Sequence, residues 1–190
     1  MRTNFDLPKN IWKLIAYFGI ATLVVMSIMS FYTIPVLFEM TDGMPLLDMR
    51  VFGYYSPDVY NYLTALGEKG IKFYLYRQLI IDSIFPMCYS TFLGLLIHTL
   101  FYKARFDGRS AWMWMLPVFT AGFDYLENLC IYYYLINYPL FIRDFALPFS
   151  TVTVIKFILM GFSFYGLYLA YDKYKHRQPY KPRQLFSDFR

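Results

Sequence analysis

The stretch IWKLIAYFGIATLVVMSIMSFYTIPVLF, residues 11–38, indicates the class of protein to which this chain belongs. Its 28 positions contain one charged residue, Lys13. A helix rises about 1.5 Å per residue, so this stretch can cross a hydrocarbon core of about 30 Å. It is too long for a signal peptide, and no small-residue cleavage site follows it, so we interpret it as a retained membrane span.

Three further apolar runs follow, and Gly, Pro and polar residues separate them. Hydrophobic residues make up 58% of the 190 residues and charged residues 16%, whereas soluble domains have about 45–50% and about 25%. This composition excludes a soluble enzyme, a disordered tail and a secreted disulfide scaffold. We therefore predict an all-α, polytopic membrane protein in which four transmembrane helices form a bundle. It is a single domain over residues 1–190, with spans at about 11–38, 73–102, 111–138 and 148–171.

The distribution of Lys and Arg predicts the orientation of these spans. Five lie in the loops assigned to the outer side: Arg50, Lys69, Lys72, Arg77 and Arg143. Twelve lie at the termini and in the loop after the second span: Arg2, Lys9, Lys13, Lys103, Arg105, Arg109, Lys173, Lys175, Arg177, Lys181, Arg183 and Arg190. By the positive-inside rule we expect a multi-pass cell-membrane protein with both termini cytoplasmic. The net charge of +5 then reflects orientation and a basic cytoplasmic tail, 172–190, and no nucleic-acid partner is expected.

The first outer loop, residues 39–72, contains the signals of a short helix at 57–67. Ser56 can cap it, Pro57 suits the first helical position and Asp58 the first turn, while Gly67 or Gly70 can end it. Apolar residues recur through it at helical spacing, so the helix is amphipathic. We expect it to lie on the membrane surface or to cap the bundle.

Four ionisable residues fall inside the apolar runs: Asp82, Asp124, Glu127 and Lys156. Each costs at least about 2.5–3.5 kcal/mol at the centre of a lipid-exposed helix. Such residues face the bundle interior, pair with one another or line a wet cavity. Counted along the spans, three helices deliver these charges to overlapping depths, so one shared cluster is possible.

Local spacing adds polar neighbours to this cluster. Asp124, Glu127 and Asn128 share one face of the third span, and Asp82, Pro86 and Tyr89 share one face of the second. Arg77 lies five residues outward of Asp82 and could reach down to it. Arg50, in the loop segment 48–50, could fold over the outer mouth of the bundle and bind a lipid phosphate or a carboxylate.

These residues allow more than one function. A protonated and an ionised acid around a cavity suit general acid–base chemistry. We therefore predict a site in which Asp82 and Glu127 are acid and base, and Lys156 and Asp124 tune them. Asn128, Tyr89, Arg77 and Arg50 would bind the ligand.

Ordinary structural explanations remain open for the same residues. Buried ion pairs can simply fix helix register, and the many tyrosines at span ends are typical of an interfacial belt. We expect no cofactor and no metal site, because the acids form an all-carboxylate set without His, and the two cysteines have no CxxC motif and no His close in sequence.

In layout the chain resembles the sterol isomerase and sigma-2 receptor group. The shared features are four spans with cytoplasmic ends, a long first outer loop and an intramembrane acid, Asp82, followed by Pro86 in the second span. This resemblance implies a lipophilic ligand held between helices beside carboxylates.

We therefore expect membrane lipids as partners, together with a lipophilic small molecule that the site binds and could isomerise or cyclise. Whether the chain is an enzyme is left open. The alternatives are a proton- or cation-coupled transport component, and a non-catalytic subunit that packs on other membrane proteins or on copies of itself.

Overall fold

A computed structural model describes residues 7–106, 108–140 and 145–176. Within this part of the chain all regular structure is helical, and no strand occurs. The α-helices are α1 (Ile11–Ile28), α2 (Ile34–Met40), α3 (Ser56–Phe73), α4 (Leu79–Lys103), α5 (Leu116–Asn137) and α6 (Ala146–Lys175). Short 3₁₀ turns occur at Leu47–Met49 and Arg109–Met115.

Two pairs of these helices are joined end to end by π-helical turns. A π-helical turn, Met29–Thr33, joins α1 to α2, and a second one, Tyr74–Gln78, joins α3 to α4. The two π turns contact each other, and the hydroxyl of Thr33 donates to the side-chain carbonyl of Gln78. Both side chains are fully buried. The two π turns thus lie where a buried polar contact joins the first pair of helices to the second.

Three helical stretches are long and apolar enough to cross a membrane: Ile11–Met40, Ser56–Lys103 and Ala146–Lys175. The helix α5 is not among them, and it carries the polar residues Asp124, Glu127 and Asn128. The predicted all-α membrane class is therefore supported by the structure, with three candidate spans.

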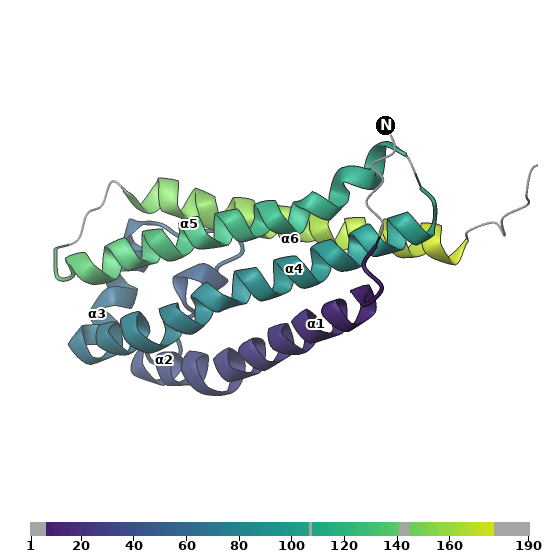
Figure 1. Cartoon of the computed structure of the whole chain (residues 1–190). Helices are drawn as coiled ribbons and strands as arrows, with labels where there is room; N and C mark the ends of the chain where they lie inside the picture. The colour runs from purple at the N-terminus through teal and green to yellow at the C-terminus, as the bar shows by residue number, and fades with distance from the viewer. Residues whose placement is uncertain (1–6, 107, 141–144, 177–190) are drawn as a thin grey trace, which may run out of the picture.

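The helix α4 packs against α1, α5 and α6, and α5 packs against α6 (Figure 1). The direction of α4 is opposite to that of α5, so the start of α4 and the end of α5 lie at the same end of the molecule (Figure 1). The start of α1 and the end of α6 lie at the other end. The side chains at residues 82, 124 and 156 therefore come from three helices that contact one another.

The surface of α1 is apolar and exposed. Only 6% of the most hydrophobic window of Ile11–Met40 is buried in the protein. Tyr17, Ile20 and Leu23 on α1 and Phe31 in the following π turn are all more than 60% exposed. An exposed apolar surface of this size marks contact with lipid or with other membrane proteins. The membrane interpretation thus explains a helix that would be unfavourable in water.

Helix ends differ slightly from the sequence prediction. Ser56 is not the N-cap: the cap is Tyr55, whose backbone N–H donates to the carboxylate of Asp58 at 2.8 Å, because the acid three residues after the cap reaches back to it. The helix turns sharply at Gly67, where φ is 56° and ψ is −174°. At the other end of the chain, α6 continues to Lys175, four residues beyond the predicted span. The remainder of the predicted basic tail, 177–190, lies outside the described residues.

Candidate functional site

The ammonium of Lys156, on α6, lies between two carboxylates of α5. Its Nζ forms an ion pair with Glu127 Oε2 and is 3.5 Å from Asp124 Oδ1. The side chains are 12%, 1% and 8% exposed in the order Lys156, Glu127, Asp124. One cation reaches both acids because residues three apart on a helix share a face.

The other oxygen of each carboxylate is also bonded. Glu127 Oε1 accepts a hydrogen bond from the Thr153 hydroxyl, and Asp124 Oδ2 accepts one from the Tyr89 hydroxyl at 3.1 Å. We call these five residues, Asp124, Glu127, Lys156, Tyr89 and Thr153, the Lys156 cluster. It joins α4, α5 and α6, and each carboxylate oxygen in it has a partner, as burial of charge requires.

A third carboxylate, Asp48, reaches this cluster from the segment between α2 and α3. Its backbone carbonyl accepts a hydrogen bond from Lys156 Nζ at 3.4 Å. Its side chain is about nine-tenths buried, and Oδ1 has no hydrogen-bond partner among the described residues. Burial raises the pKa of the Asp48 carboxyl above its usual 3.8, while the charge of Lys156 opposes that rise.

Asp82 lies near the Lys156 cluster but does not touch it. It is 6% exposed and makes no ion pair or hydrogen bond with any residue that the structure describes. The charges of Asp48, Asp124 and Glu127 all act on it. Asp82 is seven residues before Tyr89 on α4, so it lies about 10 Å along the helix axis from the Tyr89–Asp124 hydrogen bond.

Asn128 differs from the other residues whose fully buried polar atoms lack a partner among the described residues, such as Tyr74, because both polar atoms of its side chain are unpartnered. It is 5% exposed, and within the described chain neither its side-chain oxygen nor its nitrogen has a hydrogen-bond partner. It lies four residues after Asp124 on α5, about 6 Å along the axis. Since α4 and α5 run in opposite directions, Asn128 and Asp82 lie on the same side of the Tyr89–Asp124 bond (Figure 1).

The two arginines that the sequence suggested for ligand binding lie elsewhere. Arg50 pairs with Asp58 at 3.0 Å and donates to the Pro45 carbonyl, instead of a carboxylate of the cluster. Arg77 is exposed, in the π turn before α4, and makes no ion pair within the described residues. The structure thus brings together Asp124, Glu127, Lys156 and Tyr89, places Asp82 and Asn128 close by, and leaves both arginines apart.

The charges of this region do not balance. Four buried carboxylates, Asp48, Asp82, Asp124 and Glu127, lie in this region with the ammonium of Lys156, whose side chain is 12% exposed. Such an excess must be relieved by protons or by a bound group. No set of three or more His, Cys, Asp or Glu among the described residues is arranged to hold a metal ion.

Two members of the site were not predicted from the sequence. Thr153 carries a usable signal, because it precedes Lys156 by three residues and so shares its face of α6. Asp48 carries none, because its contact with Lys156 joins residues 108 positions apart.

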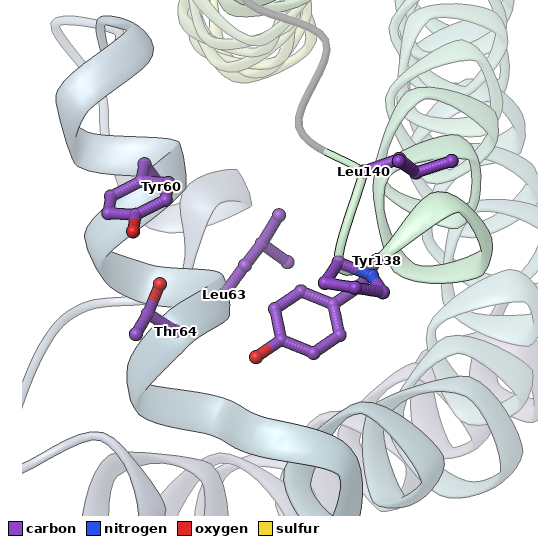
Figure 2. Close-up of a pocket in the computed structure, with 6 residues that line it drawn as sticks. Tyr60, Leu63, Thr64, Tyr138 and Leu140 are labelled. Carbon is purple, nitrogen blue, oxygen red and sulfur yellow. The ribbon is translucent and has the colours of Figure 1, made fainter.

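An open cleft lies outside this region, between α3 and the end of α5 (Figure 2). Its lining residues are Tyr60, Leu63, Thr64, Tyr138, Pro139 and Leu140. None of them is Asp, Glu, His, Lys or Arg, and none belongs to the Lys156 cluster, so this cleft is separate from the buried carboxylates.

No protein-family model, curated protein or solved structure matches this chain.

Proposed function

We propose that this chain is a four-span membrane protein that binds a lipophilic molecule beside its buried carboxylates and transfers a proton to or from it. Its spans form a bundle with both termini cytoplasmic, and α5 is the polar fourth span. The ligand lies between α4 and α5, next to Asn128 and Asp82.

The observation that carries this proposal is the side chain of Asn128. Both its polar atoms are buried and lack partners in the described chain. An unsatisfied buried amide costs about 1–3 kcal/mol, and buried polar groups of native proteins almost always have a partner. A polar group of a bound molecule supplies those hydrogen bonds.

Asp82 is the acid best suited to exchange a proton with this molecule. The other two acids of the spans are held by Lys156, Thr153 or Tyr89, whereas Asp82 has no partner among the described residues. In an isomerisation the ligand gains one proton and loses another, so its composition does not change. One carboxyl group donates the first proton, and a second carboxylate accepts the other. In this scheme Glu127 remains the base, the Lys156 ammonium stabilises its charge, and Asp124 competes for the same ammonium.

Two alternatives receive less support from the same geometry. A proton relay needs groups through the whole membrane, but α4, α5 and α6 carry no carboxylate between the Lys156 cluster and the end that bears Asp172. A purely structural subunit leaves the unpartnered Asn128 unexplained.

The test compares Asn128→Leu with the wild-type protein. Mass spectrometry of organic extracts from both purified proteins should show a lipophilic compound in the wild type that is lost from the variant. Ser83→Ala is the control. Ser83 is exposed on the same helix as Asp82, and its hydroxyl donates to the Leu79 carbonyl one turn earlier in that helix. In Asp82→Asn the compound should remain bound but with an altered ratio of substrate to product.

The contrary result is equally specific. If no ligand meets Asn128, removing two unsatisfied polar atoms should stabilise the protein and leave its extract unchanged. That outcome would refute the binding proposal and favour a structural subunit.

A further inference from the structure

The segment between α2 and α3 runs along the side of α6 instead of passing over its end (Figure 1). The Tyr54 backbone N–H donates to Ser150 Oγ at 2.7 Å, and a Cβ on Gly53 would lie 3.3 Å from Val154 Cγ2. The Asp48 carbonyl accepts from Lys156 Nζ. These three contacts lie four, eight and ten residues into α6, or about 6, 12 and 15 Å from its start.

The polar end of α6 sets the membrane depth of these contacts. Asp172 and Lys173 pair at 3.6 Å and must lie outside the hydrocarbon core. Lys156 precedes Asp172 by 16 residues, or about 24 Å, so in a core of about 30 Å it lies about 6 Å below the opposite face. Ser150, about 33 Å from Asp172, lies at that face. Asp48 is therefore within the hydrocarbon region, and Gly53 and Phe52 are at its edge.

Many backbone polar groups of this segment are hydrogen-bonded within the protein. Non-helical backbone at membrane depth is tolerated only where its polar groups are satisfied by protein. Arg50 side-chain nitrogens donate to the Pro45 carbonyl, Met49 N to Leu46 O, Arg50 N to Leu47 O, and Gly53 N to Arg50 O. Lys156 and Ser150 supply partners for Asp48 and Tyr54. These bonds satisfy part of the segment's polar backbone within the protein.

The outward side of the segment is apolar. Phe52 is fully exposed, Tyr55 is 71% exposed, and Val51 and Met49 are 46% and 43% exposed. On α6, which this segment contacts, Leu147 is 67% exposed and Ile158 52%. In water this surface would cost roughly 25 cal/mol per Å², whereas acyl chains cover it without cost.

We propose that residues 44–55 form a re-entrant segment in the half of the bilayer opposite the Asp172 end of α6, with Phe52 at the edge of the acyl-chain region and Asp48 covering the Lys156 cluster. The segment closes the cluster toward the aqueous phase, so access to the cluster is lateral, from the lipid. The inference depends on α6 crossing the membrane, and it is independent of the ligand and the reaction proposed above.

Spin-label accessibility in phosphatidylcholine liposomes tests the depth of Phe52. A nitroxide is attached to Phe52→Cys in a Cys88→Ala, Cys130→Ala background, and its collision rates with oxygen and with a water-soluble nickel chelate are compared. Labels at Phe162→Cys, on the exposed middle of α6, and at Glu68→Cys, beside the turn at Gly67, are the lipid and aqueous controls. All three side chains are exposed, so these replacements leave the core intact.

The oxygen-to-nickel ratio at Phe52 should be higher than at Glu68 and lower than at Phe162, because Phe52 lies at the edge of the hydrocarbon region and Phe162 lies near its centre. A ratio equal to that at Glu68 would place the segment in water and overturn the proposal. A label shielded from both reagents would place Phe52 against protein and would overturn it as well. Neither result depends on a bound ligand, so this test is separate from that of the proposed function.

Discussion

Removal of the Lys156 ammonium should strongly destabilise the protein. In Lys156→Met the side-chain volume is nearly kept, but Glu127 and Asp124, 1% and 8% exposed, lose the one cation that pairs with them in the described part of the chain. Breaking a buried ion pair from one side costs about 3–5 kcal/mol, because the remaining charge is left buried and uncompensated. Two carboxylates lose their counter-charge in this variant, so we expect the upper part of that range.

A second replacement separates charge from packing. Glu127→Gln keeps an oxygen that can accept from the Thr153 hydroxyl while it removes one stranded charge. The double variant Lys156→Met, Glu127→Gln should therefore be more stable than Lys156→Met alone. The double-mutant cycle should give a coupling free energy within the range of about 0.5–3 kcal/mol found for residues in direct contact.

The assay is equilibrium unfolding in mixed micelles with increasing dodecyl sulfate, followed by far-ultraviolet circular dichroism. Lys173→Met is the matched control, because this lysine is about half-exposed at the end of α6, and its loss should change stability by no more than about 0.5 kcal/mol. An unfolding curve of Lys156→Met that matches the wild type would refute the reasoning. Additive effects in the cycle would also contradict it.

Three other outcomes follow from the fold. Gly67→Ala should destabilise by about 1–3 kcal/mol in the same assay, because φ of 56° with ψ of −174° suits only glycine, whereas Gly122→Ala, in a helix with no atom near the added Cβ, should stabilise by about 0.5–1 kcal/mol. Burial raises the pKa of Asp48 above 3.8 in the folded protein, so folding favours the protonated carboxyl. The contribution of Asp48 to the free energy of unfolding is therefore complete below pH 3.8 and is lost as the pH rises through the pKa of the folded state. Asp48→Asn should remove that part of the decline in a pH series of unfolding curves. Ser56→Cys should react with an impermeant maleimide from outside intact cells and Arg109→Cys only after permeabilisation; the reverse would invert the proposed topology.

Much of the fold follows from residue patterns in the sequence. Apolar length predicts the long helices, and Gly67 predicts the sharp turn before the second span, because both signals are local. The helical spacing of Asp124 and Glu127 places them on one face, and depth counting brings Lys156 to their level. The ion pairs of Lys156 with Glu127 and Asp124 agree with this reasoning.

The rest depends on contacts that no local pattern encodes. The approach of Asp48 to Lys156 requires the whole segment after α2 to pack along α6, through Gly53 and Ser150, and such packing is decided by shape across the fold. Arg50 could be expected at the cluster because of its charge, but Asp58 is much closer to it along the chain and pairs with it instead. The sequence therefore shows which charged residues lie within apolar spans, but their ion-pair partners depend on tertiary packing.

The most direct test of the central claim is an experimental structure of the purified protein in lipid nanodiscs, at a resolution that shows bound molecules between α4 and α5. We predict non-protein density within hydrogen-bond distance of the Asn128 amide that extends toward the Asp82 carboxyl, with Lys156 still between Glu127 and Asp124. An Asn128 amide bonded to neighbouring side chains, with no molecule between the two helices, would contradict the claim.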